Sequence, residues 1–254
     1  MRVDVLLGGA PHAPADVADH LVVVIDVFRA ATTAAVALAH GARAVLPCET
    51  VEAAALQAKS MDRESVRLGG ERHMQRIDGF DFGNSPLEYT EAMVRDRTIV
   101  FTTTNGTRAL AASQRALACY FTGFVNVQAT VDALAEHVAS AGARYATIVC
   151  SGTDGQLSLE DVVCAGRIVR LLQDTGVIEQ LTDGARASML IEAPYRDSTA
   201  ALAYDATHGR ALTAAGFGAD VACCLTLDRF AHAVTSRDRL LRRSDLIVNM
   251  ATAE

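Results

Sequence analysis

Short apolar runs alternate with amphipathic segments along most of the chain. A run of three to six apolar residues between polar ones predicts a buried strand, whereas apolar residues spaced three or four apart predict a helix. The predicted strands are Val3–Leu7, Leu21–Ile25, Ala44–Leu46, Val66–Leu68, Thr98–Phe101, Ala116–Phe121, Tyr145–Cys150, Asp220–Leu225 and, at the end, Leu246–Met250. The predicted helices are Ala30–His40, Val51–Met61, Thr107–Ser113, Val127–Ala141, Leu159–Gln173, Asp183–Ile191 and Ser198–His208.

This alternation favours an α/β layered fold with a largely parallel sheet. Glycines at positions 41, 142 and 176 follow three of the predicted helices and are suitable stops for them. The chain has no proline-rich linker, charge block or low-complexity segment. We therefore predict a single domain over residues 1–254, either undivided or formed from two similar, closely packed lobes with a boundary near residues 115–145.

Composition narrows the classes of function. The chain has 254 residues, is 50% hydrophobic and carries a net charge of −7, so it can form a core but has no basic surface suited to nucleic acid. No apolar run approaches the ~18 residues of a membrane span, and the first residues are too short a run for a secretory signal. We expect a cytoplasmic protein that binds neither nucleic acid nor membrane.

The cysteines and the single lysine limit the kinds of catalysis that the chain can perform. The six cysteines form no C-x-x-C pair and are expected to be reduced core residues, although Cys150 could instead be a nucleophile at the end of its strand. Lys59 is the only lysine and lies in a predicted helix, which excludes a Walker-type lysine and disfavours a Schiff base. Arginines, hydroxyl groups and backbone N–H groups must therefore recognise any anionic ligand.

Four polar loops follow predicted strands. They begin at Asp26, within the segment Leu68–Leu87, at Thr102 and at Ser151. Because the carboxyl ends of parallel strands meet at one edge of a sheet, where ligands bind in such folds, we expect the four loops to converge.

Two of these loops are suited to anions. The segments Asn105-Gly106-Thr107 and Gly152-Thr153-Asp154-Gly155 lead into predicted helices, whose free N–H groups favour phosphate, sulfonate or carboxylate. Three arginines near the loops could add charged hydrogen bonds, namely Arg29, Arg72 and Arg108. The alternative for each loop is an ordinary turn that caps a helix.

The same loops carry carboxylates that suit a hard cation such as Mg²⁺. These are Asp26, Glu71, Asp81, Glu160 and Asp161. Asp26 follows an entirely apolar strand and is the strongest candidate, with a helix cap as its alternative role. Glu160 and Asp161 could simply stabilise the start of a helix. His73 and His208 are further candidates, each with a packed or surface role as its alternative.

The motifs resemble those of the 2-phosphosulfolactate phosphatase family, the ComB-like proteins. The matching segments run from about Leu21 to Phe217 and are VVVIDVFRAATTAAVALAHGA, LGGER, GFDFGNSPLEYT, IVFTTTNGTRAL, IVCSGTDGQLSLEDVVCAG and HGRALTAAGF. The resemblance implies a three-layer α/β/α fold, a homodimer, and a Mg²⁺-dependent hydrolase that converts (R)-2-phospho-3-sulfolactate to 3-sulfolactate and phosphate in the route to coenzyme M. One departure is His73-Met74, where the family pattern would place a glycine pair.

The resemblance also implies roles for individual residues. The implied catalytic residues are Asp26, Arg29, Glu71, Arg72 and Asp161. The implied substrate-binding residues are Asn84, Thr104, Asn105, Gly106, Thr107, Arg108, Ser151, Gly152 and Thr153. The implied metal ligands are Asp26, Glu71, Asp81 and Glu160.

In the mechanism that we expect, Asp26 and Glu71, with water or Asp161, hold Mg²⁺ against the phosphate while arginines neutralise the remaining charge. A carboxylate then either orients water or attacks directly to give an acyl phosphate. A haloacid-dehalogenase-type phosphatase would need Asp-x-Asp, and Phe28 occupies the second position. Two rival hypotheses stay open: a phosphatase of another small phosphorylated 2-hydroxy acid, and a non-catalytic anion-binding module, against which the many loop carboxylates argue.

Overall fold

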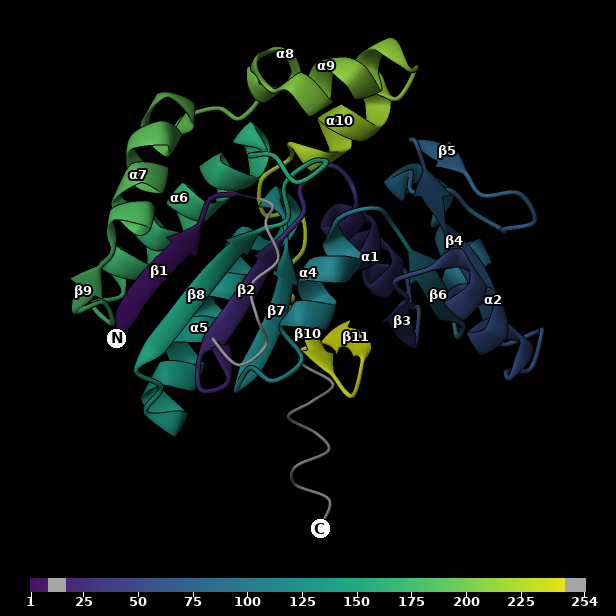
Figure 1. The fold of residues 1–254 in the computed structure, drawn as a ribbon, viewed down its shortest axis with the longest axis horizontal. Coiled ribbons are helices and arrows are strands. Elements are labelled where there is room, and N and C mark those ends of the chain that lie inside the picture. The colour runs from purple at the N-terminus through teal and green to yellow at the C-terminus, as the bar shows by residue number, and fades with distance from the viewer. Residues whose placement is uncertain (9–16, 245–254) are drawn as a thin grey trace.

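All the strands in the described residues, 1–8 and 17–244 of the computed structural model, belong to one sheet (Figure 1). They are β1 Arg2–Leu6, β2 Leu21–Ile25, β3 Ala44–Pro47, β4 Val66–Arg72, β5 Gln75–Arg76, β6 Thr98–Thr102, β7 Ala118–Thr122, β8 Tyr145–Cys150, β9 Gln180–Leu181, β10 Val234–Arg237 and β11 Leu240–Arg243. The α-helices are α1 Ala30–Ala39, α2 Val51–Lys59, α3 Glu91–Val94, α4 Gly106–Ala112, α5 Val127–Ala141, α6 Leu159–Asp174, α7 Asp183–Glu192, α8 Leu202–Asp205, α9 Thr207–Ala214 and α10 Gly218–Cys224.

Two groups of parallel strands make up most of the sheet. Its order is β5-β4-β6-β3-β11-β10-β7-β2-β8-β1-β9. The strands β7, β2, β8, β1 and β9 pair in parallel in one group, as do β3, β6 and β4 in the other. The antiparallel hairpin β10–β11 pairs with β7 on one side and β3 on the other, and it lies between the groups at the lower centre of Figure 1. The predicted α/β class with a mixed, largely parallel sheet is confirmed.

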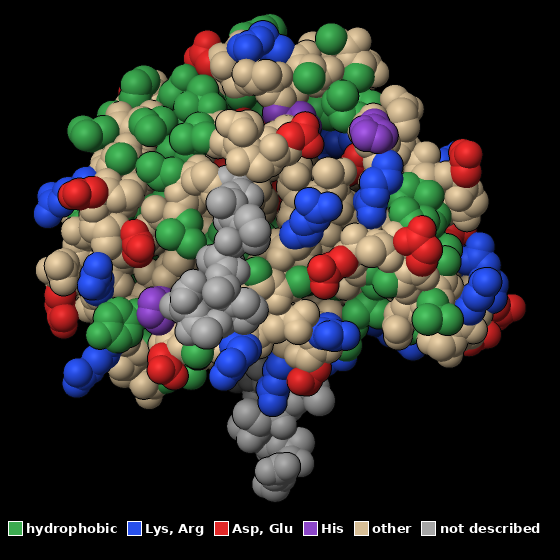
Figure 2. All heavy atoms as spheres, viewed as in Figure 1, with side chains coloured by type: hydrophobic (Ala, Val, Ile, Leu, Met, Phe, Trp, Pro, Cys, Tyr) green, Lys and Arg blue, Asp and Glu red, His purple; other side chains and the backbone are tan. Residues whose placement is uncertain are grey.

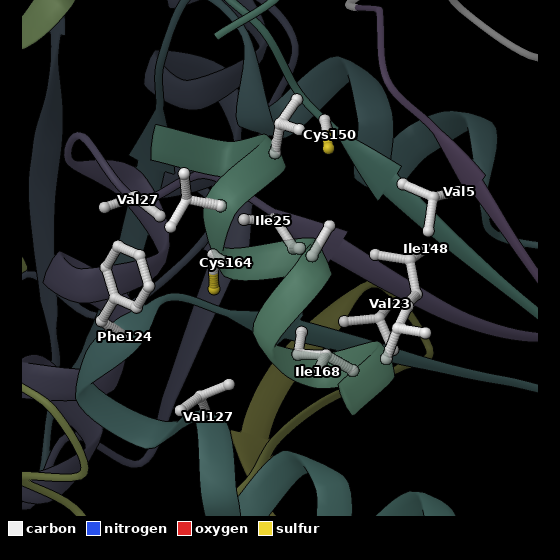
Figure 3. Packing of buried hydrophobic residues seen from close by; sticks show 14 of the residues in the cluster. Val5, Val23, Ile25, Val27, Phe124, Val127, Ile148, Cys150, Cys164 and Ile168 are labelled. Carbon is white, nitrogen blue, oxygen red and sulfur yellow. The ribbon is translucent and has the colours of Figure 1, made fainter. Parts of the chain in front are cut away.

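Strand β2 lies at the centre of the larger group and is buried on both faces. Leu21, Val23 and Ile25 face a core shared with α5 and α6, and Figure 3 shows Val23 and Ile25 among the packed side chains. Val22 and Val24 face a second core shared with α1. Because alternate strand residues point to opposite faces, helices cover both faces of the sheet and produce three layers. Each fully buried aliphatic side chain contributes about 1.5–3 kcal/mol, so β2 holds the residue that follows it firmly.

Helix α1 is buried because its residues are small. Its sequence AATTAAVALA leaves no residue exposed, and five of its alanines lie in the second core. Alanine has the highest helix propensity and little side-chain bulk, so α1 packs closely against the sheet. The helix ends before Gly41, whose φ of 91° is the left-handed conformation expected of a helix stop.

Two predictions about the last third of the chain were wrong. Asp220–Leu225 was predicted as a strand, but Gly218–Cys224 forms α10, which buries Val221, Cys223 and Cys224. A short apolar run does not distinguish a buried strand from a buried helix. Ser198–His208 was predicted as one helix, but α8 and α9 are separated by Ala206, which is extended at φ −75° and ψ 132°.

Four strands were missed, namely β5, β9, β10 and β11. Two of them have only two residues, and the β10–β11 hairpin reads VTSR and LLRR without clear alternation. Asp238 and Arg239 turn this hairpin with φ values of 52° and 64°, without the glycine that usually signals such a turn. The predicted strand Leu246–Met250 lies outside the described residues. The strands on both sides of residues 115–145 share one sheet, and the division into lobes stays a prediction.

The cysteines have the buried, reduced character that the sequence predicted. All six are free, and all except Cys48 are buried. Burial raises the pKa of the Cys150 thiol well above its ordinary value, with further contributions from nearby Asp161 and Glu160, so this thiol is a packing residue rather than a thiolate nucleophile. Within residues 1–8 and 17–244, no helix has both the length and the apolar character needed to cross a membrane.

Charged side chains of both signs are mixed over the face seen in Figure 2, and hydrophobic side chains lie between them. No continuous basic surface is visible on this face.

Helices α6 and α7 pack closely against each other at Gly166. A Cβ added there would overlap the Ser188 carbonyl and lie 2.7 Å from the Glu192 Cβ. We predict that Gly166→Ala lowers the free energy of unfolding by about 1–3 kcal/mol through overpacking, as measured by urea denaturation. Gly218→Ala is the control, because its added Cβ would meet only the Thr213 side chain, at 3.7 Å. Equal stability of the two variants would contradict the close packing.

Candidate functional site

A cavity of about 760 Å³ opens where β2, β4, β6 and β8 end. This volume is within the range of roughly 300–1,000 Å³ that small-molecule sites occupy. All four predicted loops contribute to its wall, and α9 contributes a fifth side. The predicted site residues that line it are Asp26, Arg29, Glu71, Asn84, Thr104, Asn105, Thr153 and Glu160.

The other predicted site residues do not line the cavity. Three lie directly behind it and are buried, namely Gly106, Ser151 and Asp161. Arg72 is turned toward the main chain and Thr102, and its guanidinium donates to the Glu71 carbonyl at 2.7 Å and the Thr102 hydroxyl at 3.0 Å. The remaining four are Asp81, Thr107, Arg108 and Gly152. Arg108 is exposed, and Thr107 is buried with its hydroxyl donating to the Thr103 carbonyl.

Asp81, a predicted metal ligand, has a different environment. Its carboxylate accepts hydrogen bonds from the Arg63 guanidinium at 2.9 Å and the Leu68 N–H at 2.8 Å. Arg63 and this N–H hold the pKa of Asp81 below its ordinary value, against the opposing effect of partial burial, which is the largest single influence. Through these hydrogen bonds Asp81 fastens the loop after β5 to β4. Because Asp81 does not line the cavity, it is not among the side chains that could hold a metal there.

Asp26 follows β2 and is only 7% exposed. One carboxylate oxygen accepts the Ala30 N–H at 3.1 Å, so Asp26 also caps α1, which was its alternative role. The other oxygen lies against Gly106, where an added Cβ would be 2.6 Å from it. Burial is the main reason that the pKa of Asp26 is raised to about 6; the negative charges of Glu71 and Glu160 act in the same direction, and the Ala30 N–H and His208 act against it. Asp26 is therefore a desolvated carboxylate at the wall of a cavity, as functional carboxylates often are.

Asp161 ties two of the loops together from behind the cavity. Its carboxylate accepts the Val27 N–H at 2.9 Å and the Gly152 N–H at 3.1 Å. Burial, with the charges of Glu160 and Asp26, raises the pKa of Asp161 well above its ordinary value. The loops after β2 and β8 are thus held at a common carboxylate, which makes Asp161 a positioning residue.

Glu71 performs a similar function for the smaller group of strands. One oxygen accepts the N–H and hydroxyl of Thr104, at 3.1 and 3.0 Å, and the other accepts the Met74 N–H at 2.9 Å. It therefore connects the turn after β4 to the loop after β6. His73 and Met74 form this turn with φ values of 52° and 66°, a conformation that favours glycine, and both line the cavity.

His208 lines the cavity, although the sequence offered little indication that it belongs to the site. Its Nδ1 lies 3.3 Å from the Thr153 hydroxyl and 3.6 Å from the Glu160 carboxylate. It belongs to α9, which the sequence pattern did not resolve as a separate helix. Only its place before Gly209 in the segment HGRALTAAGF marked it as a candidate.

Several polar atoms of the wall are buried and find no hydrogen-bond partner within the described part of the chain. They are the Asn84 Oδ1, the Thr103 Oγ1 and the Ser158 Oγ, and the Ser151 Oγ behind the wall is in the same state. Because buried polar groups are nearly always paired in native proteins, these atoms indicate a polar ligand or ordered water.

The donor set suits a hard divalent cation. Among the described residues, no three His, Cys, Asp or Glu side chains form a ready chelating group. Mg²⁺, however, is commonly bound by one or two carboxylates together with water and substrate oxygens. Asp26, Glu71 and Glu160 share one cavity wall, and the charges of the two glutamates add to the burial that raises the pKa of Asp26. A cation between them would reverse this unfavourable charge.

Comparisons with known proteins agree on one family. A family model described as 2-phosphosulpholactate phosphatase matches residues 10–238. A protein of Caldanaerobacter subterraneus named "Probable 2-phosphosulfolactate phosphatase" is 36% identical over 233 residues, which cover 90% of this chain and 92% of that protein. Proteins with the same name from Pseudothermotoga lettingae and Clostridium beijerinckii are 38% and 33% identical, over 89% of this chain and 93% and 92% of their own lengths.

The hydrogen bonds of Glu71 predict a loss of stability when its charge is removed. Glu71→Gln places an NH₂ group opposite either the Met74 or the Thr104 N–H, which leaves a donor without an acceptor. We expect the free energy of unfolding in a urea titration to fall by about 1–3 kcal/mol. Glu52→Gln, on the exposed face of α2, is the control. If Glu71 only carried charge for a ligand, its neutralisation beside Asp26 would leave stability unchanged or higher.

Proposed function

The chain belongs to the 2-phosphosulpholactate phosphatase family, and on that premise we propose that it hydrolyses (R)-2-phospho-3-sulfolactate to 3-sulfolactate and inorganic phosphate. One observation supports this most directly: the cavity wall brings Asp26, Glu71 and Glu160 together with Arg29. Carboxylates that can hold a cation, next to a guanidinium that can bind phosphate, are what phosphoryl transfer requires.

We propose that Asp26, with Glu71 or Glu160, holds Mg²⁺. The ion, when bound, polarises the phosphoryl group and lowers the repulsion between the phosphate and these carboxylates. Asp26 is suited to this role because its carboxylate is desolvated and fixed by the Ala30 N–H. Glu71 keeps the Thr104 loop in place through its hydrogen bonds.

The substrate carries two anionic groups, and the chain offers different donors for them. Arg29 is the only arginine or lysine among the described residues of the wall, and it would bind the phosphate by charge-assisted hydrogen bonds. The Thr103 and Ser158 hydroxyls would bind the sulfonate or carboxylate as neutral donors. The Asn84 side chain, which lines the same cavity, would donate through its NH₂ group. An oxygen nucleophile then attacks phosphorus, either a water that gives its proton to a carboxylate, or Asp26 itself, which forms an acyl phosphate that water hydrolyses in a second step. In both cases the bond from phosphorus to the oxygen on C2 breaks, and that oxygen takes up a proton to become the 2-hydroxyl of 3-sulfolactate.

A second substrate class has support from the shape of the cavity. Its wall includes Phe28, Leu157 and Leu159 as well as the polar groups, and its volume of about 760 Å³ exceeds what a three-carbon acid fills. Another small phosphorylated 2-hydroxy acid, with a larger apolar substituent, therefore remains an alternative substrate within the same chemistry.

Replacement of Asp26 tests the proposed metal site. Asp26→Asn keeps an oxygen acceptor for the Ala30 N–H, so we expect a folded protein whose turnover with Mg²⁺ falls by at least roughly 100-fold, the upper end of the loss seen for outer-shell partners of metals. Asp96→Asn, at an exposed position with φ of 60° that asparagine tolerates, is the matched control. Unchanged phosphate release by the Asp26 variant would exclude the proposed role.

Removal of the metal gives an independent readout. We expect EDTA to abolish phosphate release and added Mg²⁺ to restore it. Calorimetric titration of Mg²⁺ should give binding heat with the wild-type protein and none with Asp26→Asn. Full activity in EDTA would remove the cation from the mechanism.

A panel of phosphate esters tests the substrate. We expect the highest kcat/KM for (R)-2-phospho-3-sulfolactate, compared with phosphoglycolate, 2-phospholactate and 2-phospho acids with larger apolar substituents. A higher kcat/KM for an apolar ester would favour the second substrate class. Tight binding without hydrolysis across the panel would favour the anion-binding module instead.

A further inference from the structure

Arg29 reaches the cavity from a fully buried ion pair. One of its terminal nitrogens donates to Asp220 of α10 at 2.8 Å, and the two side chains are 3% and 4% exposed. Its other terminal nitrogen donates to the Met74 carbonyl at 3.3 Å. The pair joins segments 191 residues apart in the chain.

Two further contacts restrain this pair. The second oxygen of Asp220 accepts the Ser85 hydroxyl at 2.7 Å, so both carboxylate oxygens are in use. The Phe217 ring lies under the guanidinium, 4.3 Å from its central carbon. The stacked ring and a carboxylate that Ser85 holds in place limit the rotations by which a long arginine side chain would otherwise move.

The geometry points to Asp220 as the positioning residue for Arg29 in anion binding, and this inference rests on the proposed function. Asp220 does not line the cavity. It therefore acts through Arg29, which does line it, and Ser85 holds Asp220 in turn. A buried ion pair is weak evidence for stability by itself, because desolvation offsets the attraction between its charges. We therefore explain the pair by its position: it holds the Arg29 guanidinium at the wall of a ligand cavity, where the guanidinium can bind an anion.

The Arg29–Asp220 pair also affects the net charge next to the cavity. Asp220 balances Arg29 before phosphate binds, so the protein does not bury an isolated cation. The remaining guanidinium hydrogens stay available to a phosphate oxygen, because a guanidinium has five N–H donors. The wall is otherwise acidic, so the orientation of this one arginine has a large effect on phosphate affinity.

Three variants separate positioning from general stability. Asp220→Ala removes both hydrogen bonds and lets Arg29 move. Asp220→Asn keeps an oxygen for Arg29, and the Ser85 hydroxyl can accept from the new NH₂ group. Glu192→Ala is the matched control, because Glu192 is a fully buried acid paired with Arg170 at 3.3 Å, away from the cavity wall.

The readouts are the affinity for inorganic phosphate by calorimetry, with and without Mg²⁺, and KM and kcat of the intact protein. We expect Asp220→Ala to weaken phosphate binding and raise KM by roughly 10- to 100-fold, the effect of a misplaced binding group, with a smaller change in kcat. Asp220→Asn should stay within about threefold of wild type. Glu192→Ala should lower the free energy of unfolding without changing the phosphate affinity or KM.

Wild-type phosphate affinity in a folded Asp220→Ala variant would overturn the inference, and so would an equal loss in Glu192→Ala. If Asp220→Ala does not fold, Ser85→Ala takes its place. Weaker phosphate binding by that variant would support the inference, and unchanged binding would overturn it. The binding measurement does not require turnover. If the wild-type protein binds phosphate but hydrolyses no ester, the proposed function is refuted, and the comparison of phosphate affinities still tests the role of Asp220.

Discussion

The arrangement of the site depends on buried carboxylates that bind backbone N–H groups of loops from different strands. Asp161 joins the loop after β2 to the loop after β8, and Glu71 joins the turn after β4 to the loop after β6. Loops on a protein surface are otherwise mobile, because few packed contacts restrain them. Carboxylates with several N–H partners give these loops the rigidity that a strand has from its neighbours.

This construction has an electrostatic consequence. Asp26 and Asp161 are both buried, and burial together with the charge of Glu160 raises the pKa of each. Like charges held together in a desolvated site lower the stability of the fold, so their presence is best explained by chemistry at the cavity. A divalent cation and an anionic substrate together would restore charge balance, which a substrate anion alone could not do next to these carboxylates.

The C-terminal third of the chain completes the site from outside the sheet. Helix α9 supplies His208, and α10 supplies Asp220, whose ion pair with Arg29 connects the region to the first loop. Meanwhile the β10–β11 hairpin connects the two parallel groups of strands. The later part of the chain therefore holds together both the sheet and the wall of the cavity, although its own elements are short.

The sequence by itself determined the fold class and the convergence of the four loops. Entirely apolar runs such as Leu21–Ile25 and amphipathic segments such as Val127–Ala141 are specified by local periodicity, and the structure reproduces both ranges. Only the tertiary structure decided that α10 is a helix, that Asp220 pairs with Arg29, and that Asp81 lies outside the cavity beside Arg63. The reason is that these depend on partners far away in the chain, and local periodicity carries no information about which distant side chains meet.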